Sequence, residues 1–241
     1  MSFAEIAIYS FITTHITIVC VSLYLHRYLT HRQFTLHPAL EHLMRFWLWF
    51  ADGVISKPWV AQHRKHHKYT DVHGDPHSPV LAGNWNVTLQ CMVPNFIRLY
   101  QYFDTDWALE HYGQGTPDDW FERNIYGKLP RLGLILFLLI NVLLFGFWIG
   151  LSVWLFHLFY VPFFSTACIS GFAHWFGYKN KESSDNSRNL FPIGIIISGD
   201  ELHNNHHRDP SNPNFAHRWF EFDIGYFYIK IFEKIGLLKL R

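Results

Sequence analysis

The chain has 241 residues, and its 20 Lys and Arg against 19 Asp and Glu give a formal net charge of +1, so no basic field points to nucleic acid. Apolar residues make up 49% and charged residues only 16%, well below the roughly 25% of soluble domains, which excludes a highly charged disordered chain and argues against an ordinary soluble globule. The three cysteines, Cys20, Cys91 and Cys168, have no C-x-x-C spacing, which excludes a disulfide framework and a cysteine zinc site.

The first apolar segment, Phe3–Leu25, carries Glu5 and His15 and is otherwise apolar or small. At 1.5 Å per residue it is just long enough for a bilayer core of about 30 Å. Because it lacks a basic N-terminal region and a small-residue cleavage site, we expect a membrane span rather than a removed signal peptide. A second segment, Leu40–Trp59, is interrupted by four charged residues, a glycine and a proline, so we expect it to lie in the interface or to re-enter.

The third apolar segment, Leu132–Tyr178, contains no acidic or basic residue in 47 positions. It is long enough for two spans, and we expect a helical hairpin with its turn around Gly146–Gly150. Within the last helix, Pro162 predicts a kink or a local irregularity of the kind that membrane helices tolerate.

Two polar regions, Arg64–Arg131 and Lys179–Arg241, flank this hairpin. The second ends in an amphipathic, aromatic-rich stretch, Phe220–Leu240, that suits a membrane face. Since there is no internal repeat, low-complexity run or linker, we expect a single domain over residues 1–241.

Histidine, with 17 copies, is the unusual feature of the composition, and it is the commonest metal ligand in proteins. Three clusters stand out: His26-Arg-Tyr-Leu-Thr-His31, His63-Arg-Lys-His66-His67 and His203-Asn-Asn-His206-His207. The last two share the spacing i, i+3, i+4, which on an α-helix places all three imidazoles on one face. His26 and His31 would lie about 140° apart on an α-helix, so we expect them to converge only if the helix ends between them or a metal lies beside its end.

Eight clustered histidines exceed the three or four ligands of one zinc ion, and calcium and magnesium prefer oxygen. We therefore predict a site for two iron ions, because imidazole binds iron well and leaves positions open for dioxygen. Neutral ligands leave the metal charge unbalanced, so nearby carboxylates are expected to orient the imidazoles. The candidates for that role are Asp71, Asp75, Asp200 and Glu201. The dispersed histidines are interpreted as hydrogen-bonded packing residues: His15, His42, His111, His157 and His217.

The three histidine motifs, in this order and separated by a polar loop and an apolar hairpin, resemble those of the integral-membrane fatty acyl desaturases. The nearest group is the Δ9 acyl-CoA or acyl-lipid desaturases in their short bacterial form, and the resemblance runs from about Thr14 to Leu240. It implies an all-α membrane protein in which transmembrane helices, interfacial helices and a cytosolic helical cap hold a histidine-rich di-iron site. It also implies a ninth ligand, His174, within Gly171-Phe-Ala-His-Trp-Phe-Gly-Tyr178.

The activity implied by the resemblance is an oxygen-dependent desaturation that introduces a cis double bond, at Δ9, into a saturated fatty acyl chain. Two iron ions are the implied cofactor, O₂ is the co-substrate, and membrane lipid is a further partner. No flavin, haem or Fe–S motif is present, so two electrons would come from a ferredoxin- or cytochrome-type donor protein with its reductase. An acidic carrier could meet the basic surface at Arg64 and Lys65. Aromatic residues of the hairpin would line an apolar tunnel together with Phe46, Trp47 and Trp49.

Two positions depart from the family pattern. Four residues before the ninth histidine the family commonly has an asparagine that reaches iron through water, whereas this chain has Ser170. Before the second cluster, animal acyl-CoA desaturases carry an Arg-Asp pair thought to meet the CoA end, whereas this chain has Ala61-Gln62. The acyl carrier therefore stays open among CoA, acyl carrier protein and phospholipid.

The clusters build one site only if they lie on the same side of the bilayer. A spanning Phe3–Leu25 and a non-spanning Leu40–Trp59 keep the first two clusters together, and the hairpin returns His174 and the third cluster to them. Basic residues flank the clusters, as expected of a cytoplasmic face. We expect a multi-pass protein of a bacterial inner membrane, with three spans, an external N-terminus and a cytoplasmic site.

Two other functions stay open at this point. A membrane di-iron fatty acyl hydroxylase would use the same ligands, and the spacing of the histidines does not separate it from a desaturase. A non-catalytic metal transporter or sensor is disfavoured, because transporters place ionisable ligands at mid-membrane and these clusters lie at span ends.

Overall fold

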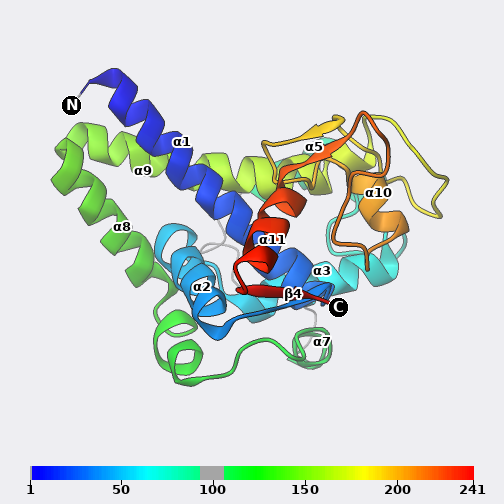
Figure 1. Ribbon diagram of the computed structural model, residues 1–241, viewed down its shortest axis with the longest axis horizontal. Coiled ribbons are helices and arrows are strands. Elements are labelled where there is room, and N and C mark those ends of the chain that lie inside the picture. Colours follow the sequence, from blue (N-terminus) through cyan, green and yellow to red (C-terminus); the bar gives the residue numbers. More distant parts are fainter. Residues whose placement is uncertain (1, 93–105) are drawn as a thin grey trace.

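The computed structural model describes residues 2–92 and 106–241 and is mostly helical. Its two longest helices are composite: α1 (Phe3–Cys20) continues into the π-helix η1 (Val21–Thr30), and α9 (Phe147–Pro162) continues into the π-helix η3 (Phe163–Cys168). They lie side by side, with α8 (Pro130–Phe145) turning back along α9 (Figure 1). The irregularity predicted at Pro162 is present, because the winding changes from α to π directly after it.

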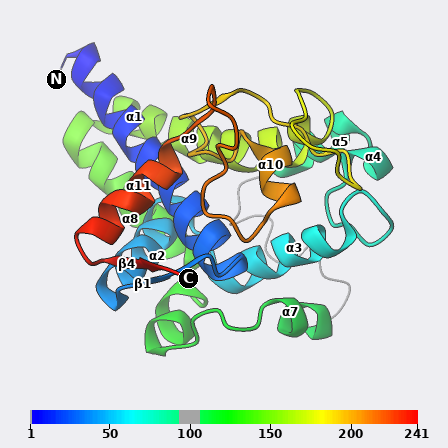
Figure 2. The same cartoon turned by 45° about the vertical axis from the view of Figure 1, so that its right-hand side comes forward.

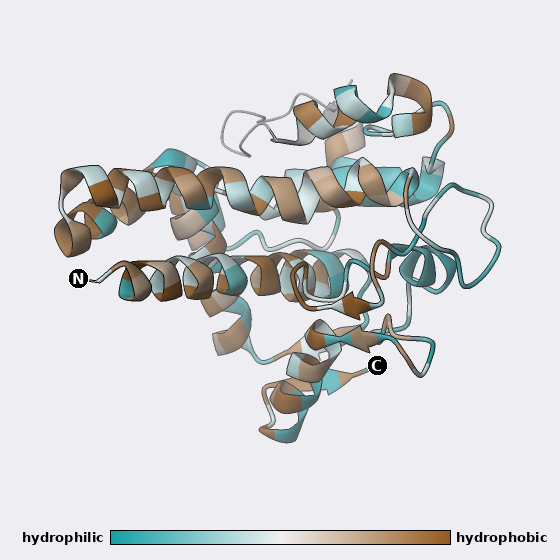
Figure 3. Ribbon diagram, turned by 90° about the horizontal axis from the view of Figure 1, so that it is seen from above, coloured by the Kyte–Doolittle hydropathy of each residue, from teal (hydrophilic) through white to brown (hydrophobic). Residues whose placement is uncertain are grey.

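Two helical stretches of the described chain, Phe3–Thr30 and Phe147–His174, are each 28 residues long and apolar enough to cross a membrane. The predicted first span therefore extends past Leu25, and α8 is a shorter apolar helix of 16 residues. Large apolar side chains point away from the protein along these helices; Phe11 is 62% exposed and Leu143 83%. Hydrophobic residues follow α1 and α9 along most of their length (Figure 3). Such continuous apolar surface is typical of contact with hydrocarbon.

Polar contacts join these helices on their inner faces. The Thr17 hydroxyl lies 3.3 Å from His157 Nε2, and the Trp47 indole N–H donates to Thr17 Oγ1 at 2.8 Å. Hydrogen bonds of this kind hold membrane helices together, because hydrocarbon offers polar groups no other partner. His157 is therefore a packing residue, as the sequence predicts.

The predicted interfacial segment is two helices, α2 (Pro38–Asp52) and α3 (Ser56–Tyr69). Gly53 ends α2 in the left-handed conformation with φ of 64°, and a Cβ there would lie 2.9 Å from Leu134 of α8. Glycine adopts this left-handed conformation without strain and has no Cβ that would clash with Leu134. This turn directs α3, with its three histidines, away from the spans and into the cap (Figure 2).

Short elements complete the cap. They are α4 (Pro79–Ala82), α5 (Asn84–Met92), α7 (Asp106–Tyr112), the π-helix η2 (Glu122–Tyr126), the 3₁₀ turn η4 (Phe172–His174), α10 (His203–Arg208) and α11 (Ile224–Lys234). Strand β1 (Phe34–Leu36) pairs antiparallel with β4 (Leu238–Leu240), placing Phe34 opposite Leu240, and β2 (Ile193–Gly194) pairs in parallel with β3 (Phe222–Asp223). The expected aromatic-rich helix at the end of the chain is thus α11, followed by a strand. The side chain of Cys91 lies outside the described residues.

A buried acid between α2 and η2 makes stability depend on pH. Glu122 Oε2 lies 3.7 Å from Arg45 Nη1, too far for a hydrogen bond, and burial raises the pKa of Glu122 from 4.5 to about 7. The folded-state pKa exceeds the unfolded one, so the stability contributed by the neutral acid is full below pH 4.5 and is lost as the pH rises to 7. We expect Glu122→Gln to raise the free energy of unfolding by up to about 3 kcal/mol at pH 8 and by little at pH 5.

Thermal or denaturant unfolding at both pH values measures this difference. The matched control is Asp118→Asn, which removes an exposed carboxylate of the same region. An equal effect of Glu122→Gln at pH 5 and pH 8 would show that ionisation of this residue does not limit stability.

Candidate metal centre

The first histidine pair owes its geometry to π-helical winding. In a π-helix the N–H of residue i+5 bonds to the carbonyl of residue i, so residues five apart lie one above the other. The N–H of His31 donates to the carbonyl of His26 at 3.1 Å, and the two ring centroids are 4.9 Å apart. The helix does end between them, at Thr30, but the predicted separation of 140° is wrong because it assumed α-helical winding.

The second and third motifs each divide their histidines between two groups. On α3, His63 and His67 point to one group and His66 to the other. On α10, His206 joins the first group, while His203 and His207 join the second. Neighbouring residues are 100° apart on an α-helix, so positions i+3 and i+4 can serve two adjacent centres. The expectation that three imidazoles share one face is therefore only partly met.

All nine predicted histidines lie together in the cap. One group holds His26, His31, His63, His67 and His206, and the other holds His66, His174, His203 and His207. Within each group, one nitrogen from each ring lies within 4.8 Å of those from the others. Nε2 of His206 is 2.9 Å from Nε2 of His26 and 3.0 Å from that of His67. The groups adjoin, with the ring centroids of His67 and His207 4.5 Å apart.

Carboxylates hold the outer nitrogens of four of these rings. Each carboxylate oxygen lies 3.0–3.1 Å from a ring Nδ1, in the pairs Asp200 with His26, Asp75 with His66, Asp71 with His174 and Asp185 with His207. A carboxylate only accepts, so Nδ1 carries the proton and the Nε2 lone pair faces the group. Burial would raise the pKa of Asp71 and Asp75, but the hydrogen bonds from the histidines lower both to about 2.

The remaining electrostatics fit a pair of metal ions. Burial, reinforced by the neighbouring histidines, holds the pKa of six rings well below its usual value: those of His31, His63, His67, His203, His206 and His207. Neutral imidazole is the form that binds metal. Nε2 of His31 and Nε2 of His207 are buried without a hydrogen-bond partner in the described chain, a cost of about 1–3 kcal/mol each that a bound ion would remove.

The two asparagines of the third motif anchor α10. Asn205 Nδ2 donates to Glu221 Oε2 at 2.9 Å and to the Phe215 carbonyl at 2.8 Å, and Asn204 Oδ1 accepts from the backbone N–H of Asn180 at 3.0 Å. Of the three partner residues, Glu221 and Phe215 are buried and Asn180 is half-buried. These bonds fix the helix, and with it the three histidines that it contributes.

The sequence patterns do not identify Asp185 and His77 as neighbours of the histidines. They also predict that Glu201 orients an imidazole, whereas it binds backbone N–H groups. Asp185 lies 22 positions before its partner in a serine-rich loop, where no spacing reveals it. His77 stacks on His66 with ring centroids 4.3 Å apart, and its place in a turn-rich Asp-Pro-His sequence was the available signal. Glu201 is hydrogen-bonded to backbone instead of to an imidazole of the described chain, because its carboxylate accepts from the N–H groups of Ile197 at 2.7 Å and Gly199 at 3.1 Å.

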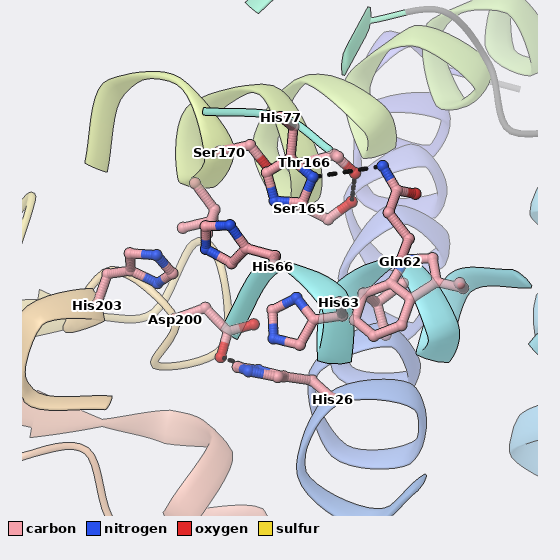
Figure 4. Close-up of a pocket in the computed structure, with 13 residues that line it drawn as sticks. His26, Gln62, His63, His66, His77, Ser165, Thr166, Ser170, Asp200 and His203 are labelled. Carbon is pink, nitrogen blue, oxygen red and sulfur yellow. Dashed lines mark hydrogen bonds and ion pairs between the residues drawn. The ribbon is translucent and has the colours of Figure 1, made fainter. Parts of the chain in front are cut away.

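A small cavity of about 40 Å³ opens beside the histidines (Figure 4). Four of the nine histidines line it: His26, His63, His66 and His203. The other lining residues include His77, the α3 residues Trp59 and Gln62, and Ser165, Thr166 and Ser170, which follow Pro162. Ser170 thus faces the site, as its position in the sequence predicts. The aromatic residues expected to line a tunnel do not line this cavity: Trp47 lines a separate apolar cavity of about 430 Å³ between α1, α2 and α11.

The comparison with known families agrees with this geometry. A model of the fatty acid desaturase family matches residues 4–221. The chain belongs to this family. It is 31% identical over 221 residues to the Delta-9 acyl-lipid desaturase 1 of Arabidopsis thaliana, covering 88% of this chain and 67% of that protein.

Two further relatives show the range of the family. Acyl-CoA 5-desaturase AL21 of Anemone leveillei is 30% identical over 223 residues, covering 88% of this chain and 64% of that protein. A hex-5-enoyl acyl-carrier protein acetylenase of Moorena producens (strain JHB) is 28% identical over 239 residues, covering 92% and 72%. The desaturase described here is thus an oxidoreductase acting on fatty acyl chains, and the hydroxylase alternative is not favoured.

Removal of the Asp185 carboxylate tests whether the hydrogen bonds to the outer ring nitrogens support the metal centre. We expect Asp185→Asn to lower activity or metal affinity by about 10–100-fold, because an amide no longer fixes the ring orientation of His207 as a carboxylate does. The control is Asp209→Asn, at an acid whose side chain accepts from Ser211. Metal content and turnover of both variants in the same membrane preparation measure the effect, and equal values for the two would refute it.

Proposed function

We propose that this desaturase introduces a cis double bond at the Δ9 position of a saturated fatty acyl chain, using O₂, two electrons and two iron ions. The observation that supports it most is the gathering of nine imidazoles, with their Nε2 atoms inward, into a group of five and a group of four. Members of the family are generally di-iron enzymes, and the relative from Arabidopsis thaliana is a Delta-9 acyl-lipid desaturase by name.

In this proposal all nine histidines are iron ligands, five at one ion and four at the other. When bound, the two irons would supply the activation of O₂ and the removal of one hydrogen from each of two adjacent methylenes. Overall, one O₂, two electrons, two protons and these two hydrogens give a double bond and two waters. The protein keeps the ring tautomers fixed through Asp71, Asp75, Asp185 and Asp200 and keeps bulk water out by burial.

The cavity of about 40 Å³, lined by two histidines of each group, is where the acyl chain would meet the site. Trp59, Thr166 and Ser170 line it next to His66 and would position the reacting carbons. A side chain as small as serine leaves room there for a water or for the substrate. We place the whole activity in one domain spanning residues 1–241.

The partners and location follow from the same arrangement. Two apolar helices carry the cap at one end, and we propose a multi-pass protein of a bacterial inner membrane with its site on the cytoplasmic face. Two electrons come from a ferredoxin- or cytochrome-type donor with its reductase. Arg64 is a poor candidate contact for that donor, because its guanidinium donates to the carbonyls of Leu29, Tyr112 and Gln114.

Expression in a host that lacks unsaturated lipids, followed by mapping of double bonds in its fatty acids, tests the proposal. We expect monounsaturated chains with a cis bond between carbons nine and ten. A double bond at another position would refute the Δ9 assignment alone, and an alcohol as the product would refute desaturation.

A further inference from the structure

A second hydrophobic surface lies outside the spans, in the polar tail of the chain. Residues 190–197, with the sequence Leu-Phe-Pro-Ile-Gly-Ile-Ile-Ile, contain no polar side chain. Phe191, Ile193, Ile195 and Ile196 expose 54%, 55%, 40% and 47% of their surface. Exposed apolar residues that follow one another so closely mark an interaction surface.

This segment lies alongside the spans rather than beyond them. Its two buried ends, Leu190 and Ile197, belong to one core cluster with Ile18 of α1, and Tyr160 of α9 packs against that cluster. Ile18 lies within the candidate span Phe3–Thr30, and Tyr160 lies within the candidate span Phe147–His174. The segment therefore packs against the sides of both apolar helices.

Part of the backbone of this segment is paired within the protein. The N–H of Leu190 donates to the Glu201 carbonyl at 2.7 Å, and the N–H of Ile197 donates to the Glu201 carboxylate at 2.7 Å. The carbonyl of Pro192 accepts from the N–H of Phe222 at 2.9 Å. Pairing of this kind lowers the cost of moving these backbone groups away from water.

Exposed aromatic residues lie near the segment in the chain or through its strand pairing. β2 pairs in parallel with β3 through Ile193–Phe222 and Gly194–Asp223, and Trp219, three residues before Phe222, is 95% exposed. Trp175 and Phe176, which directly follow the candidate span ending at His174, are 53% and 60% exposed. Tryptophan gathers where hydrocarbon meets the polar headgroups, and the exposed Arg218 stands next to Trp219.

We propose that residues 190–197 insert into the leaflet on the cap side of the membrane, with Trp219 and Trp175 at its polar boundary. The occupant of this surface is the acyl chains of membrane lipid, because the surface is apolar, carries no charge and adjoins the candidate spans α1 and α9 through the core cluster of Ile18 and Tyr160. The segment is also close to the metal centre in the chain, because Asp200, the hydrogen-bond partner of His26 Nδ1, follows Ile197 by three residues. The proposal rests on the membrane placement of α1 and α9 and not on iron.

Site-directed spin labelling tests this insertion. Cysteine is introduced at Ile196, at Ile12 on the outer face of α1, and at Trp107 on α7, which is 65% exposed. Each labelled full-length chain is placed in nanodiscs of phosphatidylcholine and phosphatidylglycerol, and the unsubstituted chain gives the background from its native cysteines. Collision rates with O₂ and with a water-soluble nickel chelate report whether a label lies in lipid or in water.

We expect the label at position 196 to behave as that at position 12, with high O₂ and low nickel accessibility, and the label at position 107 to show the reverse. Water-like values at 196 with lipid-like values at 12 would overturn the proposal alone. Water-like values at 12 would overturn the membrane placement with it. Dipolar broadening between labels at 196 on different chains would show that a second copy of the protein, and not lipid, covers this surface. That result would refute the proposal.

Discussion

The variant His206→Ala is expected to make no unsaturated fatty acid while it still accumulates in the membrane. The Nε2 atom of His206 is about equally close to two other ring nitrogens of the five-histidine group, 2.9 Å from that of His26 and 3.0 Å from that of His67. Removing it takes away one of five donors and leaves a cavity at the centre of the site. We therefore expect the first ion to be lost and, with it, all product.

Fatty acid analysis of the host and metal analysis of the purified protein measure these two losses. The control is His111→Ala, which removes an exposed ring that stacks on Trp107 with centroids 4.7 Å apart, outside both groups. His111→Ala should keep full activity. Normal product from His206→Ala would show that this ring is not a metal ligand.

The variant Arg27→Met is expected to lower the free energy of unfolding by about 3–5 kcal/mol, because it leaves a buried charge without its partner. Arg27 is fully buried, its Nη2 lies 2.9 Å from Asp223 Oδ2, and its Nη1 donates to the Ser198 carbonyl at 3.0 Å. The guanidinium thereby joins η1, the loop before α10 and the start of α11.

Thermal unfolding in detergent measures the effect, and the double variant Arg27→Met with Asp223→Asn is the control. The double variant should recover part of the stability, since it no longer buries an unpaired carboxylate. If Arg27→Met unfolds at the wild-type temperature, the ion pair contributes nothing to the fold. If the double variant is no more stable than the single one, the loss comes from packing and not from charge.

Much of the candidate site was predictable because its information is local. The spacing of His63, His66 and His67 on a helix identifies a cluster directly, and Asp75 lies close enough in sequence to be proposed as its partner. The apolar spans were equally visible, since a bilayer core demands a long uninterrupted stretch. His174 was different: only the resemblance to the family, and not its spacing, singled it out.

The remainder depends on contacts that no local pattern reveals. Periodicity predicts an α-helix through His26 and His31, whereas the chain is wound as a π-helix from Val21 to Thr30. The hydrogen bond from His207 to Asp185 joins a helix to a distant loop. The sequence places residues 190–197 in a polar tail, because an eight-residue apolar stretch is too short to indicate a span.

The central claim is that two iron ions occupy the two histidine groups, and Mössbauer spectroscopy of ⁵⁷Fe-loaded protein, combined with metal analysis, tests it most directly. We expect two irons per chain and two distinguishable iron environments, because one group offers five imidazoles and the other four. One iron per chain, zinc in place of iron, or iron that survives removal of both His66 and His206 would contradict the claim.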